Sequence, residues 1–181
     1  MVFYAGWGCM RYFDLGEHVM NVPGHAESTL ARIPKLGAQW KVIHEFNPTE
    51  YLQPGLQGPP RTAIWVRFAE ECYSLAFSPN GVELWFEEEG DGFPGHIQDI
   101  AETQPDELPP IGEWTRIEMT LAVNEETGKY FISVSIAGIE VMKVMRQHDP
   151  ETLVMDATIG CGDPHHAMSG GIRGLVVLEK S

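Results

Sequence analysis

Apolar and polar residues alternate along most of this chain with a period of two. In the segment 113–123 every second residue near the centre is apolar, namely Ile117, Met119, Leu121 and Val123. The intervening residues are polar, namely Arg116, Glu118 and Thr120. This period is that of a β-strand with one buried face. The spacing of three and four residues that an amphipathic helix requires is nearly absent.

The same alternation predicts further strands on both sides of this segment. They cover residues 39–46, 62–68, 72–78, 81–87, 129–136, 139–145 and 171–179. Asn80–Gly81 and Ala137–Gly138 are turn signals that join neighbouring strands into hairpins. Many short strands separated by turns are typical of an all-β sandwich or barrel.

Segments rich in proline and glycine separate the predicted strands. The longest are residues 47–60, 88–110 and 160–170, which we predict to be loops. No change of composition marks a linker and no internal repeat is evident. The 181 residues therefore fit a single domain, 1–181, that is large enough to bury a core.

The charge of the chain narrows the range of partners. Its 26 acidic and 12 basic residues give a formal net charge of −14. This disfavours nucleic acid and anionic membranes, because binding phosphate requires clustered Lys and Arg. No apolar run reaches the roughly 18 to 20 residues that cross a bilayer.

Three cysteines, Cys9, Cys72 and Cys161, stand far apart with no CxxC pair, which disfavours a structural zinc site. Two interpretations are open: a Cys9–Cys161 bridge, if the terminal strands are neighbours, or three reduced and buried thiols. The N-terminus shows no basic region followed by an apolar stretch, so no signal peptide is expected. The chain is then cytoplasmic, or a mature form of a secreted protein.

An ordered series of motifs runs through the second half of the chain. A strand led by Trp114 (EWTRIEMTL) is followed by GKYFISVSIAGIEV at 128–141, a GDPHHA loop at 162–167 and a closing GxIxxLxV strand at 170–177. The first half contributes IPKLGAQWKVIHEFNPT at 33–49. Over residues 28–179 this series resembles the laminin-G-type and related concanavalin A-like domains of animal extracellular proteins. The resemblance implies a two-sheet antiparallel jelly roll, adjacent first and last strands, and an extracellular location. It leaves the activity open, because this architecture hosts lectins, adhesive modules, glycosidases and lyases.

The segment His44–Glu45–Phe46–Asn47–Pro48 is similar to the His-Phe-Asn-Pro-Arg strand of galectins. That resemblance implies that His44 and Asn47 contact a sugar. The sequence departs from the galectin pattern in two ways. Glu45 is inserted, which turns the following side chains to the opposite face of a strand, and Thr49 replaces the sugar-contacting Arg.

The outward positions of the central strands form the best candidate binding face. If Ile64 and Val66 point inward, Trp65 and Arg67 point outward. By the same alternation Glu83, Trp85 and Glu87 point outward from the neighbouring strand. An indole stacks on the apolar face of a pyranose while charged groups bond its hydroxyls, so these residues suit a sugar. The alternative is that a loop or the other sheet covers the tryptophans.

Two segments contain residues that suit a metal ion. The acidic run Glu87–Glu89 with Asp91 has the oxygen ligands that Ca²⁺ prefers, although its spacing matches no known calcium loop. Asp163, His165 and His166 could hold a metal in the glycine-rich loop before the last strand, if the backbone bends. Each segment has a simpler interpretation as a solvated loop. We expect no required cofactor, with Ca²⁺ as a possible ligand.

The catalytic signatures that an enzyme would need are missing. Glu83 and Glu87 share a face, but four residues along a strand separate them by about 13 Å. A retaining glycosidase places its two carboxyl groups about 5 to 5.5 Å apart. No G-x-S-x-G, phosphate loop or HExxH is present.

The sequence therefore predicts a non-catalytic module that binds a glycan or an extracellular protein. The alternatives are a structural or self-associating domain, which would form a homo-oligomer, and a carbohydrate-active enzyme.

Overall fold

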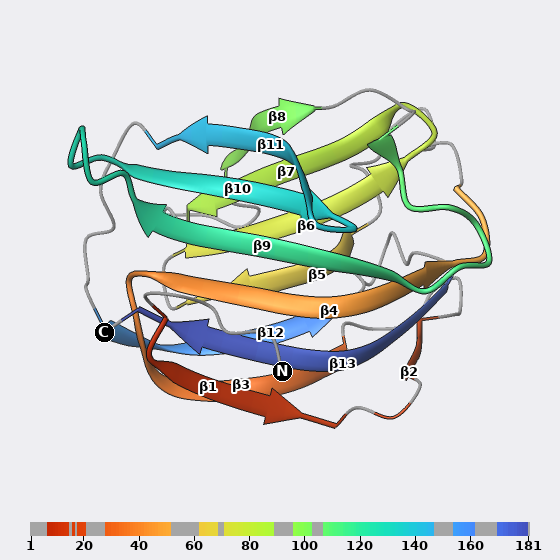
Figure 1. Ribbon diagram of the computed structural model, residues 1–181, viewed down its shortest axis with the longest axis horizontal. Helices are drawn as coiled ribbons and strands as arrows, with labels where there is room; N and C mark the ends of the chain where they lie inside the picture. Colours follow the sequence, from red (N-terminus) through yellow and green to blue (C-terminus); the bar gives the residue numbers. More distant parts are fainter. Residues whose placement is uncertain are drawn as a thin grey trace.

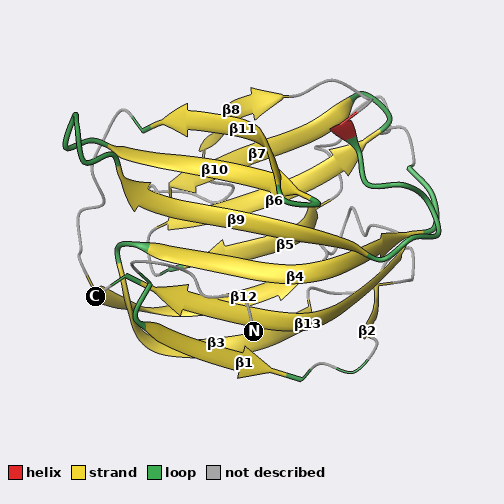
Figure 2. Cartoon of the chain, in the orientation of Figure 1, coloured by secondary structure: helices red, strands yellow, loops and turns green. Residues whose placement is uncertain are grey.

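The computed structural model describes residues 7–14, 16, 18–20, 28–51, 62–68, 71–88, 96–102, 107–146, 154–161 and 170–180. Strands make up almost all of this described chain (Figure 2). Within it, no helix is long and apolar enough to cross a membrane.

The strands form two antiparallel sheets packed face to face (Figure 1). In sheet A the order is β1 (Cys9–Phe13), β13 (Gly170–Glu179), β4 (Trp40–Pro48), β9 (Thr115–Val123), β10 (Tyr130–Ile136) and β11 (Ile139–Met145), with β2 (His18–Met20) also paired to β13. In sheet B the order is β3 (Ser28–Gly37), β12 (Val154–Cys161), β5 (Thr62–Arg67), β6 (Glu71–Ser78), β7 (Gly81–Glu88) and β8 (His96–Glu102). The protein is an all-β sandwich, as the alternation allows, and its two antiparallel sheets form the jelly roll that the resemblance to concanavalin A-like domains implies.

The predicted meander and the adjacency of the terminal strands are both confirmed. Strand β10 pairs with β9 on one side and β11 on the other, and β6 pairs with β7 across the turn at Asn80. Strand β1 pairs with β13 over Cys9–Phe13.

The sequence prediction missed some strands. Strands β1, β2 and β12 fall where no strand is predicted, and the end of β12 enters the predicted loop 160–170. Strand β8 lies inside the predicted loop 88–110. Strand β3 was not predicted because Pro34 and Lys35 interrupt its alternation. Lys35 has a positive φ of 55° there, which is an uncommon backbone conformation for a non-glycine residue.

The core lies between the inner faces of the two sheets. Phe46 of sheet A stacks on Phe77 of sheet B, with ring centroids 5.2 Å apart. Trp40 of sheet A meets Tyr73 of sheet B edge to face at 5.7 Å. The aliphatic residues predicted to face inward on β9 and β10 join this core: Ile117, Met119, Leu121, Ile132, Val134 and Ile136. Aromatic pairs of this kind add to the energy gained by burial alone.

The interpretation of Cys9 and Cys161 as a bridged pair is wrong. Cys161 is a free thiol inside the core and belongs to β12 of sheet B, whereas Cys9 begins β1 of sheet A. Burial raises the pKa of the Cys161 thiol to about 12, so it stays protonated at neutral pH. Cys72 is a buried thiol as well, with its Sγ 3.7 Å from the Ser74 hydroxyl oxygen.

Candidate functional site

Trp65 of the predicted sugar-binding face on sheet B is covered. We call this face, made of Trp65, Arg67, Glu83, Trp85 and Glu87, the sheet B platform. Its neighbours Ile64 and Val66 belong to the core, so Trp65 lies on the outer face, as the alternation predicts. The expectation that Trp65 is exposed is wrong, because only 3% of it is accessible. The indole lies against Gly160 of the paired strand β12, and the Arg67 guanidinium stacks over the ring at 4.6 Å from its centroid. A sugar could reach this ring only if Arg67 moved.

The other members of this platform are only partly defined. Arg67 is exposed, whereas Glu83 is buried and accepts a hydrogen bond from the Ser78 hydroxyl at 2.9 Å. Trp85 and Glu87 belong to β7, but their side chains lie outside the described residues. The structure thus brings Trp65 and Arg67 together as a packed pair. The sheet B platform as a whole stays a prediction.

His44 does not contact a ligand at the surface, contrary to the galectin resemblance. It shares the inward face of β4 with Val42 and Phe46 of the core and is only 1% exposed. Desolvation by burial lowers the pKa of the imidazole to about 3. Neither ring nitrogen has a hydrogen-bond partner among the described residues. Asn47, three residues on, is half-buried at the end of β4.

The predicted metal ligands are not tested by the structure. Asp163, His165 and His166 lie outside the described residues, and so do Glu89 and Asp91 of the acidic run. Within the described chain no group of three or more His, Cys, Asp or Glu side chains is placed to hold a metal ion.

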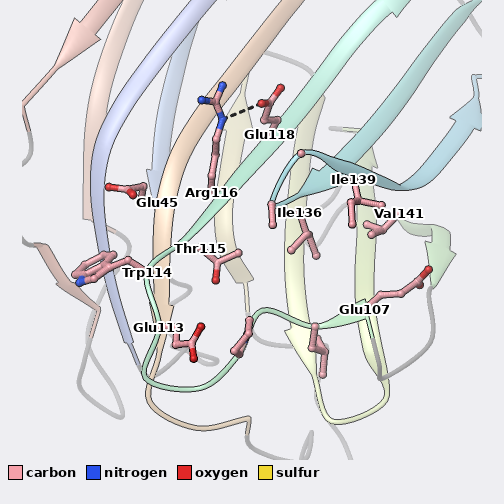
Figure 3. A pocket seen from close by; sticks show the side chains of 14 residues that line it. Glu45, Glu107, Glu113, Trp114, Thr115, Arg116, Glu118, Ile136, Ile139 and Val141 are labelled. Carbon is pink, nitrogen blue, oxygen red and sulfur yellow. Dashed lines mark hydrogen bonds and ion pairs between the residues drawn. The ribbon is translucent and has the colours of Figure 1, made fainter. Parts of the chain in front are cut away.

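A hollow of about 780 Å³ opens where β9 begins on sheet A. It lies between the segment 107–114 and the turn that joins β10 to β11 (Figure 3). Its apolar wall includes Ile136, Ile139 and Val141, and its polar lining includes Glu107, Glu113, Arg116 and Glu118. Because the polar lining is mainly carboxylate, the hollow offers hydrogen-bond acceptors to hydroxyl or amino groups.

Trp114 lies at the margin of this hollow in a packed cluster with two charged residues. The Arg173 guanidinium stacks over the Trp114 ring at 4.1 Å from its centroid. The Arg173 Nε donates to Glu45 Oε2 at 2.7 Å, and Glu45 also lines the hollow. Gly171 leaves room for the indole, because a Cβ there would lie 2.9 Å from Cη2 of Trp114. We call Trp114, Arg173 and Glu45 the Trp114 cluster.

Glu118 is held rigidly beside this cluster. Arg116 Nε donates to Glu118 Oε1 at 2.9 Å, and Lys41 Nζ donates to Oε2 at 3.0 Å. The Glu118 side chain is largely buried, so both bonds act in a medium less polar than water. Charged side chains fixed in this way are preorganised, so they lose little conformational entropy when a ligand binds.

The sequence pointed only partly to this site. Alternation indicated that Arg116 and Glu118 face outward, and Trp114 marked the start of a strand. Nothing in the sequence indicated that Arg173 lies opposite Glu45. That pairing depends on the register of β13 with β4, which shifts between Arg173 and Val176. A bulge of this kind redirects side chains and is not encoded by alternation.

No protein-family model and no curated protein matches this chain. Among solved structures it is similar to the VIP36 exoplasmic/lumenal domain in its Ca²⁺/Man3GlcNAc-bound form, with a TM-score of 0.54 and 8% identity over 96% of this chain and 84% of that one. It is also similar to the Emp47p carbohydrate recognition domain, with a TM-score of 0.52 and 11% identity over 95% of this chain and 89% of that one.

A third similar structure is domain 4 of AbnA, a GH43 extracellular arabinanase from Geobacillus stearothermophilus, in complex with arabinotriose. Its TM-score is 0.51 and its identity 15%, over 97% of this chain and 84% of that one. At such identities the likeness shows the fold alone, a two-sheet antiparallel jelly-roll sandwich.

Proposed function

We propose that this protein is a non-catalytic carbohydrate-binding module whose glycan lies in the hollow beside the Trp114 cluster. The observation that carries the proposal is the composition of that hollow. An apolar wall and a half-buried tryptophan adjoin four glutamates and an arginine, on an open surface of sheet A. A sugar ring requires this combination, because its C–H faces are apolar and its rim is a ring of hydroxyls.

The fixed charges favour binding of an uncharged polyhydroxyl ligand. Glu45 and Glu118 are already paired with cations, so the negative charge of each carboxylate is balanced. The lone pairs that remain on their oxygens accept hydrogen bonds from hydroxyl groups. Glu113 is exposed at the mouth of the hollow.

Proteins of the same fold lend support. The domain of AbnA was solved with arabinotriose and that of VIP36 with Man3GlcNAc, so two similar sandwiches hold oligosaccharides. The VIP36 structure is also a Ca²⁺-bound form, which makes calcium a variable to control in any binding test of this chain. We extend the proposal to an extracellular setting, where glycans or glycoproteins are the partners.

A glycan array should identify a ligand, whose affinity is then measured by calorimetry with Ca²⁺ and with EDTA. Replacing Trp114 by alanine should weaken binding about five- to tenfold, since one aromatic contact contributes roughly 1 to 1.5 kcal/mol. Because Trp114 also packs on Gly171 and Arg173, the exposed Glu113→Ala variant provides a second test that spares the fold. It should weaken binding severalfold.

Two variants serve as controls for this experiment. Glu126→Ala removes an exposed carboxylate from the turn after β9 and should bind like the wild type. Trp85→Ala tests the sheet B face. Full binding by the Trp114 and Glu113 variants, with binding lost in Trp85→Ala, would refute the hollow and move the site to sheet B. No retention of any glycan by the folded wild type would refute the function itself.

A second candidate function is self-association, and one observation favours it. Met10 and Tyr12 of strand β1 are 66% and 62% exposed. Within the described chain β1 pairs with β13 alone. Two large apolar side chains on one face of an edge strand are a common feature of interaction surfaces.

Sedimentation velocity should then show a mass that rises above 20.2 kDa with concentration. Tyr12→Lys should return the protein to a monomer, whereas Ile139→Lys, at an exposed residue of the other edge of sheet A, should not. A concentration-independent monomer would exclude this function.

A further inference from the structure

A second hollow, of about 540 Å³, lies on sheet A over strands β4, β9, β10 and β11. The strand register places four of its lining residues in one row across the sheet. Lys41 pairs with Thr120, Thr120 with Ser133, and Ser133 with Lys143. Three strand spacings of about 4.8 Å separate the two ends, so the backbones of the two lysines lie about 14 Å apart. Two hydroxyls thus form a floor with an ammonium group at each end.

Positive charge gathers at this hollow in an otherwise acidic protein. Three of the 12 basic residues line it, namely Lys41, Lys143 and Lys180, together with two carboxylates, Glu125 and Glu140, in a chain of net charge −14. Lys41 is bound to Glu118, and Lys180 forms an ion pair with Glu125 at 3.1 Å. Lys143 differs: within the described residues no carboxylate lies within ion-pair distance of it. Its ammonium is therefore not held in an ion pair, although Glu125 and Glu140 also line the hollow.

Aromatic rings hold two of these ammonium groups over the hollow. The Lys143 Nζ lies 4.3 Å from the centroid of the Phe131 ring, and the Lys41 Nζ lies 5.6 Å from that of Trp7. Cation–π contacts of this kind favour a particular position for a flexible side chain. Phe131 and Trp7 also give the hollow apolar edges against which a sugar ring can pack.

From these features we propose that the second hollow binds the anionic group of an acidic saccharide, with Lys143 as the principal contact. Ser133 and Thr120 donate hydroxyl hydrogen bonds to the same carboxylate or sulfate ester. The ligand bears isolated charges rather than a continuous line of them, because the net charge of −14 repels a polyanion. This inference rests on the proposed function and specifies its ligand further, as a glycan that contains an acidic unit.

The two hollows are connected through one side chain. Glu118 lines the first hollow and binds Lys41, which lines the second. Both carboxylate oxygens of Glu118 are engaged by cations, so its charge is balanced beside the anion. One oligosaccharide can therefore place uncharged units beside Trp114 and its acidic unit beside Lys143.

The probes are sodium glucuronate and glucose, which share a ring and differ in the carboxylate. Each is titrated into the ¹⁵N-labelled protein while amide chemical shifts are followed. Glucuronate should shift the amides of Ser133 and Lys143 and bind at least fivefold more tightly than glucose. Lys143→Gln should abolish that preference, and Lys129→Gln, at an exposed lysine outside the hollow, should retain it. In 0.5 M salt the preference should fall, as expected for a charge contact near the surface.

Equal affinity for the two probes would overturn this site, and so would a glucuronate preference that survives in Lys143→Gln. The result is independent of the glycan array. If the array shows no ligand but glucuronate still shifts these amides in a Lys143-dependent manner, the anion site stands and only the glycan function fails. If neutral glycans bind at Trp114 while glucuronate shifts nothing, the glycan function stands and the anion site fails.

Discussion

Replacing Gly160 by alanine is expected to lower the free energy of unfolding by about 3 kcal/mol, because overpacking a filled site forces a large side chain out of place. A Cβ at Gly160 would lie 2.0 Å from Cζ2 of Trp65, far inside van der Waals contact. The indole would have to leave the surface of β12 and expose its apolar area. Urea denaturation followed by circular dichroism measures the loss.

Two comparisons isolate the clash as the cause. Gly37→Ala, on the neighbouring strand β3, meets only the flexible carboxylate end of Glu179 and should cost much less. Trp65→Ala removes the obstacle, so adding Gly160→Ala to that variant should cost little further stability. A double-mutant cycle in which the two losses simply add would show that Trp65 and Gly160 are not coupled.

Acidification from pH 7 to pH 5 is expected to cost about 2 kcal/mol of stability through His44 alone. Burial lowers the pKa of His44 from 6.5 to about 3. Below pH 6.5 His44 binds a proton in the unfolded chain but stays neutral in the folded one. The free energy of unfolding therefore decreases as the pH is lowered. The loss continues until the folded form also binds the proton, near pH 3. Above pH 6.5 the contribution is complete.

His44→Leu removes this dependence and serves as its test. At pH 7 the variant should be at least as stable as the wild type, because leucine replaces a buried imidazole whose nitrogens have no partner in the described chain. Carboxylates elsewhere titrate in both proteins, so the informative quantity is the difference between the two pH profiles. That difference should grow by about 2 kcal/mol from pH 7 to pH 5. Parallel profiles would mean that His44 is hydrated or protonated in the folded state.

Alternation alone predicted most of the central strands of the fold. It located the strands that now form the centres of both sheets, since a half-buried strand must repeat every second residue. It missed β1, β2 and β12. It also failed at β3, where Pro34 and Lys35 break the pattern, and at β8, whose sequence HIQDIAE is too polar to stand out. In these strands the pairing with a neighbour, β12 or β7, supplies what the local sequence lacks.

The candidate site was less predictable, and Trp65 shows why. Its direction followed from alternation, but its exposure depended on Gly160 and Arg67. Gly160 lies 95 positions away in the chain and reaches Trp65 only through strand pairing. In the same way, the Trp114 cluster exists because β13 pairs with β4 in a register shifted by a bulge. Residues that no local pattern links were brought together by the sheets.

The sequence by itself determined that this protein is all-β, which face of β5, β7, β9 and β10 points to the core, and that the chain is strongly acidic. Those properties depend on the period of the side chains and on a count of charges, both of which are local or additive. Only the tertiary structure decided that Trp65 is covered, that His44 lies in the core and that Trp114, Arg173 and Glu45 meet beside a hollow. These properties depend on which residue of a distant strand lies opposite, and backbone pairing across a sheet sets that choice.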